Sequence, residues 1–381
     1  MNGLFFELLQ IAIGNRKELT RQLSDDECAS LYSECEKHAL LGIAFCGVER
    51  LPKEQFPPFD VAAEWVHDAQ VTKERNQKVT KISETVCRQL EKDGFWTCIL
   101  KGQANLISYP ECLRDYRTSG DIDLWAWPLN IGGNRRGIKD VILYSIDKAN
   151  KAGIGYPAVR YNNTELPGIW PIAVEIHHRP SFMNCWYRNR RLQKWCKDNI
   201  GNSVNVSVSG CTLPVATTSF NAIYQLGHIY CHLFDEGIGL RQILDYYMVL
   251  RTLYVEKGEN KAGNEGIMRT LGRFGMKKFT SAMMYVLQTV FAMPDEYLIC
   301  KPNEKEGRFL LNEIMQAGNF GKYDERIKRV KGSYMKVQCN HAFEKWKHNL
   351  RLITHYPEEV LWEPIFRLYH FVWRRFQLWK A

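Results

Sequence analysis

Apolar residues recur at helical spacing through the first part of the chain. The longest such stretch runs from about Val61 to Lys92, and the segments between Leu4 and Val48 show the same spacing. Ser24, followed three residues later by Glu27, has the residue types of a capping box at the start of a helix. The pattern predicts an N-terminal helical region over residues 1–93, which leads into the next region through one long helix.

Short apolar runs separated by turns replace the helical spacing between residues 94 and 210. Runs over Phe95–Leu100, Asp121–Trp127 and Ile172–His177 are typical of strands, and a helix is expected to begin at Gly102. A strand, a glycine turn, a helix and a second strand therefore follow one another. We expect an α+β fold in which a mixed sheet with flanking helices forms the core.

Helical spacing returns after this region and predicts a C-terminal helical domain over residues 211–381. Its last part, from Phe343 to Trp379, is dense in aromatic residues with interleaved arginines. From Gly321 to Ala381 the chain has 13 Lys and Arg against 6 Asp and Glu. This aromatic and basic segment could contact a membrane surface peripherally or bind a partner. An aromatic stripe buried in the core is the alternative.

Two pairs of residues in the C-terminal domain stand one helical turn apart. His228 and His232 have a spacing that can bind zinc. The metalloprotease pattern requires a glutamate directly after the first histidine, however, and Ile229 stands there. A pair of packed or substrate-facing histidines is the preferred interpretation. Arg241 and Asp245 have the spacing of an ion pair on one helix face.

Two carboxylates mark the start of the second predicted strand. Asp121 and Asp123 are two residues apart, and side chains at that spacing on a strand point to the same face. Paired carboxylate oxygens are hard ligands that can hold Mg²⁺ against phosphate oxygens. An Asp-x-Asp pair is also common at solvated turns, so the pair alone assigns no site. Its position after the glycine turn at Lys101 and Gly102 favours a metal-dependent site for nucleotidyl transfer.

The order of these elements resembles that of the nucleotidyltransferase superfamily, which includes DNA polymerase beta and the aminoglycoside nucleotidyltransferases. Three segments are more closely similar to a bacterial family of uncharacterised nucleotidyltransferases: Leu100-Lys101-Gly102, Tyr109-Pro110 and Arg117-x-x-Gly120-Asp121-Ile122-Asp123-Leu124. In that family a third carboxylate lies on a later strand, in the pattern apolar, acid, apolar, His. Val174-Glu175-Ile176-His177 matches this pattern.

The resemblance implies an enzyme that transfers a nucleoside monophosphate from a nucleoside triphosphate to an acceptor hydroxyl. Asp121, Asp123 and Glu175 would be the catalytic residues and the ligands of Mg²⁺, with Mn²⁺ as a second candidate ion. The third carboxylate would position and deprotonate the acceptor. A carboxylate buried in a strand is costly unless it is paired or metal-bound. The alternative is an edge-strand glutamate that faces solvent.

Substrate contacts are expected around the glycine turn and the paired aspartates. Lys101 could bind phosphate as a point charge, Arg117 as a two-pronged fork and Ser119 through its hydroxyl donor. The alternative is that each is an ordinary surface residue. The superfamily usually has serine after the glycine, whereas this chain has Gln103. This difference leaves open a catalytically inactive, nucleotide-binding or regulatory or scaffold protein of the same fold. The full set of expected substrate-binding residues is Lys101, Gly102, Gln103, Arg117, Ser119, Gly120, His177 and Arg241.

Bulk composition narrows the class of protein. The chain has 381 residues with 45% hydrophobic content and a net charge of +9, and no stretch reaches the ~20 apolar residues of a membrane helix. We expect a cytoplasmic protein without a transmembrane segment.

The twelve cysteines contain no Cys-x-x-Cys pair, which predicts free thiols. No nucleic-acid-binding module is evident, which argues against a nucleic-acid acceptor, and the loop with Gly132 and Gly133 lacks the spacing of a phosphate-binding loop.

Overall fold

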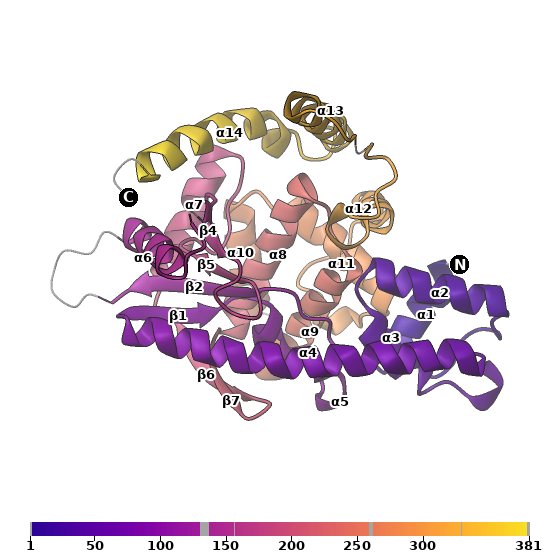
Figure 1. Cartoon of the computed structure of the whole chain (residues 1–381). Coiled ribbons are helices and arrows are strands. Elements are labelled where there is room, and N and C mark those ends of the chain that lie inside the picture. Colours follow the sequence, from indigo (N-terminus) through magenta and orange to yellow (C-terminus); the bar gives the residue numbers. More distant parts are fainter. Residues whose placement is uncertain (1, 130–136, 156, 259–261, 329, 379–381) are drawn as a thin grey trace.

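The computed structural model describes the chain except for residues 1, 130–136, 156, 259–261, 329 and 379–381. The loop with Gly132 and Gly133 therefore lies outside the described residues, as do Trp379 and Lys380 of the C-terminal segment. The described part combines a seven-stranded sheet with many helices (Figure 1). This mixed architecture confirms the predicted α+β fold class.

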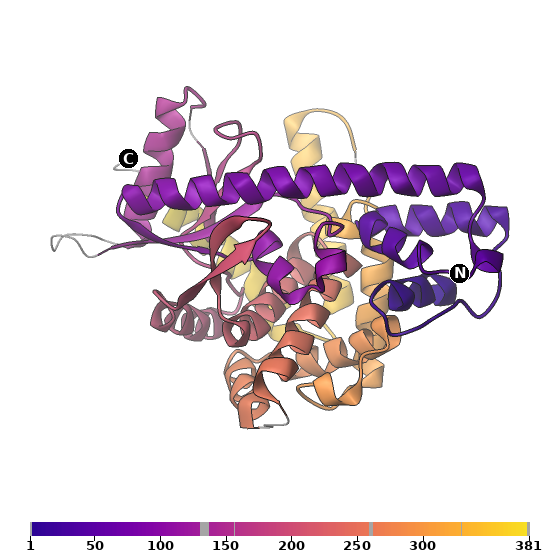
Figure 2. The ribbon, with the colours of Figure 1, turned by 90° about the horizontal axis from the view of Figure 1, so that it is seen from below.

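The N-terminal region is helical, as the apolar spacing predicts. The Ser24 hydroxyl accepts a hydrogen bond from the Glu27 amide, and the Glu27 carboxylate accepts one from the Ser24 amide, so the capping box is confirmed. The fourth helix is the longest and runs from the other N-terminal helices to the sheet (Figure 2). These elements are α1 (Asn2–Ala12), α2 (Asp25–Lys37), α3 (Leu41–Val48), the short η1 (Lys53–Gln55) and α4 (Phe59–Lys92).

One mixed sheet forms the centre of the molecule, in the order β3-β4-β5-β2-β1-β7-β6. Strands β2 and β5 are parallel, as are β1 and β7, and the other neighbours are antiparallel. The division of the chain at residue 93 and residue 210 stays a prediction, although the sheet continues past residue 210 through β7. The strands are β1 (Phe95–Ile99), β2 (Ile122–Pro128), β3 (Ala158–Val159), β4 (Asn163–Leu166), β5 (Val174–His177), β6 (Ser203–Val208) and β7 (Cys211–Ala216).

The remaining helices connect and follow the strands. The helix expected at Gly102 is a 3₁₀ helix, η2 (Gly102–Ser108), and Thr217 caps the first helix after the sheet through its side chain. The other helices between strands are α5 (Glu111–Arg114), α6 (Ile138–Lys151) and α7 (Trp186–Asp198). After the sheet come α8 (Thr218–Asp235), α9 (Leu240–Lys257), α10 (Ala262–Arg273), α11 (Lys277–Phe291), η3 (Asp295–Tyr297), α12 (Glu304–Ala317), η4 (Asn319–Gly321), α13 (Tyr334–Leu352) and α14 (Pro357–Leu378).

Alternation along β2 and β5 divides their side chains between two environments. Ile122 and Ile176 belong to a hydrophobic cluster that also contains residues of α4 and α6. On the other face, Trp125 stacks on Phe220 of α8 with ring centroids 5.8 Å apart. Because successive strand residues point to opposite faces, the carboxylates of both strands lie on the side covered by α8. One face of the sheet is therefore packed in an apolar core, and the other face carries the carboxylates.

All twelve cysteines are free thiols, as their spacing predicts. Among the helices that the structure describes, none has both the length and the apolar composition that crossing a bilayer requires.

Helix α3 lies against the loop that leads to β2, and Gly42 is the point of closest approach. A Cβ atom at Gly42 would lie 2.3 Å from the carbonyl oxygen of Tyr116, whereas one at Gly266 on α10 would meet no atom within 4 Å. We expect Gly42→Ala to lower the free energy of unfolding by roughly 1–3 kcal/mol, because the backbone must move. Gly266→Ala should instead raise it by roughly 0.5–1 kcal/mol. Urea unfolding of both variants checks this; an unchanged midpoint for Gly42→Ala would contradict the contact.

Candidate active site

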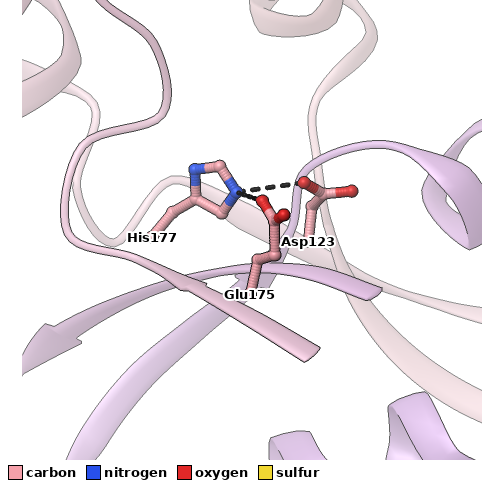
Figure 3. Close-up of side chains that lie close together, drawn as sticks. All are labelled: Asp123, Glu175 and His177. Atoms are coloured by element: carbon pink, nitrogen blue, oxygen red, sulfur yellow. Dashed lines mark hydrogen bonds and ion pairs between the residues drawn. The ribbon is translucent and has the colours of Figure 1, made fainter. Parts of the chain in front are cut away.

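The parallel pairing of β2 and β5 places two carboxylates side by side. Asp123 is the register partner of Glu175, and His177 follows two residues later on the same face of β5. The His177 Nε2 atom lies 3.0 Å from Asp123 Oδ1 and 3.4 Å from Glu175 Oε2 (Figure 3). One ligand atom of each residue lies within 4.8 Å of the other two. These three side chains could hold one metal ion between them.

Lys101, after β1, and Asp121, before β2, lie beside the cluster of Asp123, Glu175 and His177. Lys101 follows β1, and its Nζ atom lies 3.1 Å from Asp123 Oδ1. Asp121 lies one residue before β2 rather than within it, and it lines the same cleft as Lys101 and Glu175. Gly102 has a φ of +66°, a conformation that favours glycine, and allows the chain to turn beside the carbonyl of Asp121.

Opposite charges stabilise this cluster in the absence of a metal ion. Burial opposes ionisation of Asp123, but Lys101 and His177 together lower its pKa to about 2. Burial would also neutralise His177, but hydrogen bonds to Asp123 and Glu175 raise its pKa to about 9. Repulsion from Asp123, together with burial, raises the pKa of Asp121 to about 6. The site therefore contains clustered anions balanced by an ammonium and an imidazolium.

A cleft of about 210 Å³ lies between these residues and α8. His228 and His232 line its α8 wall, and their Nε2 atoms are 2.9 Å apart. Burial and the nearby Lys101 lower the pKa of both histidines, to about 4 for His232, so both are neutral at pH 7. His228 and His232 face the cleft, and their contact with substrate stays a prediction.

Gln103 and Ser119 are engaged within the protein. The Gln103 amide donates to the Ser119 hydroxyl at 2.9 Å, and that hydroxyl donates to the Asn76 side chain on α4. All three residues are buried. The hydroxyl donor expected at Ser119 is therefore used to tie the glycine turn and the loop before β2 to α4. A contact of Gln103, Ser119 or Gly120 with substrate stays a prediction.

Arg117 is paired within the protein. Its Nε and Nη2 atoms bind the two carboxylate oxygens of Asp245 on α9 at 2.7 and 2.6 Å, in a buried pair to which the Tyr109 hydroxyl also donates. The guanidinium fork therefore joins the loop to α9, and its contact with phosphate stays a prediction. The expected pair of Arg241 with Asp245 is replaced by this one, and Arg241 donates to the Thr118 carbonyl at 2.9 Å. Whether Arg241 binds substrate stays a prediction.

The sequence did not indicate two residues that support the site. Asn163 on β4 donates a hydrogen bond to the Glu175 carboxylate. Asn76 on α4 holds the loop through the Ser119 hydroxyl and the backbone carbonyls of Asp115 and Arg117. Asparagines on a four-residue strand and in the middle of a long helix have no distinctive local pattern, so only tertiary structure identifies them.

Comparison with known proteins adds one finding. A family model described as "Uncharacterised nucleotidyltransferase" matches residues 24–292, which include the whole sheet together with α8 and α9. No curated protein and no solved structure matched the chain.

Removing Asp245 should destabilise the fold. Asp245→Ala would leave the buried Arg117 guanidinium without its carboxylate, and we expect a loss of roughly 3–5 kcal/mol in the free energy of unfolding. Glu304→Ala provides the matched control, because it breaks an exposed pair with Arg308 on α12 and should cost no more than about 1 kcal/mol. Urea unfolding measures the free energy of unfolding of both variants. Equal losses would show that the buried pair of Arg117 with Asp245 stabilises the fold no more than an exposed pair does.

The charge on His177 should make the metal-free protein more stable at low than at high pH. Its folded-state pKa of about 9 lies above the ordinary value of 6.5, so its contribution is complete below about pH 6.5 and disappears as the pH rises through about 9. Chemical unfolding in the presence of a chelator, over that pH range, should show the advantage of the parent over His177→Gln shrinking as the pH rises. A difference that is constant with pH would contradict a charged His177.

Proposed function

The chain belongs to the family of uncharacterised nucleotidyltransferases, and from this we propose that it transfers a nucleoside monophosphate from a nucleoside triphosphate to the hydroxyl of an acceptor. The observation that carries the proposal is the in-register pairing of Asp123 with Glu175 beside Asp121, at a cleft that also receives Lys101. Two-metal transfer of this kind requires closely spaced carboxylates and little else from the protein.

The donor set fits a hard divalent cation. Asp123 and Glu175, with Asp121 from the same cleft, offer the carboxylate oxygens that Mg²⁺ and Mn²⁺ prefer. His177 would offer a nitrogen to the same point after losing its proton. A bound divalent cation would replace Lys101 and His177 as the partners that neutralise these buried anions. When bound, the metal would neutralise phosphate charge and orient the triphosphate for in-line attack.

Each residue of the site has a role in the proposed transfer. Glu175, held by Asn163, would orient the acceptor hydroxyl and accept its proton. The acceptor oxygen then forms a bond to the α-phosphorus, the bond from that phosphorus to the bridging oxygen breaks, and pyrophosphate leaves. Lys101 would bind an outer phosphate of the triphosphate, since its ammonium already lies at the mouth of the carboxylate cluster.

The polar lining of the cleft favours a hydroxyl-bearing acceptor. Ser181 Oγ and Asn163 Oδ1 are buried in this lining and have no hydrogen-bond partner among the described residues. Buried polar atoms of this kind require a partner, and acceptor hydroxyls would supply it.

A second candidate is a protein that binds nucleotide without transferring it. Gln103 supports this alternative, because it replaces the superfamily's serine and its amide is engaged with Ser119. Pyrophosphate release separates the two candidates. An enzyme releases pyrophosphate when supplied with a triphosphate, Mg²⁺ and a pool of hydroxylated metabolites, whereas a binding protein only retains the nucleotide.

Asp123→Asn should abolish transfer. Losing this carboxylate removes a metal ligand and the partner of Lys101, and we expect pyrophosphate release to fall by at least about a hundredfold. Asp198→Asn makes the same chemical change at an exposed position on α7 and should leave the rate unchanged. A circular dichroism melt establishes that both variants are folded. A rate for Asp123→Asn within about twofold of the parent would exclude the proposed site.

A further inference from the structure

Large apolar side chains are concentrated on the outside of the last two helices. Of the 23 large apolar side chains exposed in the described part of the chain, 13 lie between Tyr334 and Phe376. Helices α13 and α14 lie at one outer edge of the molecule (Figure 1), and both follow the segment that the family model matches. A concentration of this size on a folded surface indicates a binding face.

Helix α14 is apolar on two opposite faces. Its inner face is packed, since Phe366 stacks on Phe182 with centroids 5.0 Å apart and Trp373 contacts Tyr161 at 5.3 Å. The outer face consists of four residues at spacings of four, three and four, which form one stripe along a helix. They are Leu361, Ile365, Leu368 and Val372, with exposed fractions of 62%, 55%, 66% and 43%. Packing against the protein explains why the inner face is apolar. Packing within the described structure does not explain the outer stripe.

The acidic side chains of the two helices are buried or paired. Glu344, Glu359 and Glu363 are buried, and Glu358 binds Tyr187 and Arg188 on α7. Some basic residues also face the protein, since Lys345 binds the Phe234 carbonyl and Arg351 contacts Glu313. The exposed basic residues include Lys336 on α13 together with Arg374 and Arg375 at the end of α14. The outer surface therefore combines apolar residues with positive charge.

We propose that the outer stripe of α14, with Arg374 and Arg375, binds the surface of an anionic lipid bilayer. A helix with an apolar face and basic residues lies in the headgroup region, where apolar burial and attraction to anionic lipids add together. A second copy of this chain is the other candidate occupant, and measurement of the oligomeric state distinguishes the two. This proposal does not depend on the proposed transfer activity.

Binding at this stripe would hold the cleft close to the lipid surface. Phe366, on the inner face of α14, stacks on Phe182, and Phe182 lines the cleft that contains Glu175 and His177. The bilayer would contact one side of α14, and the cleft wall lies on the other.

Sedimentation of the full chain with vesicles tests the proposal. The parent protein should sediment with vesicles of phosphatidylglycerol and phosphatidylcholine, and much less with phosphatidylcholine alone. Leu368→Asp, and separately the pair Arg374→Glu and Arg375→Glu, should weaken binding by about tenfold or more. Added salt should weaken binding of the parent, because it screens the arginines.

Two control variants make the same kinds of substitution at other exposed positions. Val255→Asp places a charge at an apolar residue on α9 that is 72% exposed, and Lys305→Glu reverses an exposed charge on α12. Both should bind vesicles like the parent. Equal sedimentation with the two vesicle types, or an unchanged Leu368→Asp, would overturn the proposal. So would light scattering that shows a dimer dispersed by Leu368→Asp without any vesicle binding, since the stripe would then join two copies.

Discussion

The site depends on holding like charges close together on one covered face of a sheet. Parallel pairing of β2 with β5 fixes Asp123 beside Glu175, and Asp121 adds a third carboxylate one residue before β2. Such a cluster costs free energy unless cations compensate it. Lys101 and His177 provide that compensation without a metal ion. In the proposed transfer, a divalent ion with its triphosphate would replace these protein cations.

The helical regions position the loop that carries Asp121. On one side, α4 holds this loop through Asn76, which donates to the carbonyls of Asp115 and Arg117. On the other side, Asp245 of α9 binds the Arg117 guanidinium. Helix α4, which precedes the sheet, and helix α9, which follows it, therefore both support the site, although the carboxylates lie on the sheet.

The sequence predicted what depends on local pattern. Strands β2 and β5 were accessible because apolar runs are visible in short segments, whereas the association of Glu175 with Asp123 came from the resemblance to the family. The partner of Arg117 was not accessible, because Asp245 lies 128 residues further along the chain. The supporting role of Asn163 was missed for a similar reason, since β4 has only four residues and two of them are polar or charged beside the asparagine.

Anomalous diffraction from crystals that contain Mn²⁺ and a non-hydrolysable nucleoside triphosphate tests the central claim most directly. Mn²⁺ prefers the same oxygen ligands as Mg²⁺ and is visible by its anomalous signal. The account predicts a peak bonded to Asp123 and Glu175, with the triphosphate bound beside Lys101 and the Lys101 ammonium moved from Asp123 to a phosphate. A peak at other residues, or a triphosphate bound away from this cleft, would contradict it.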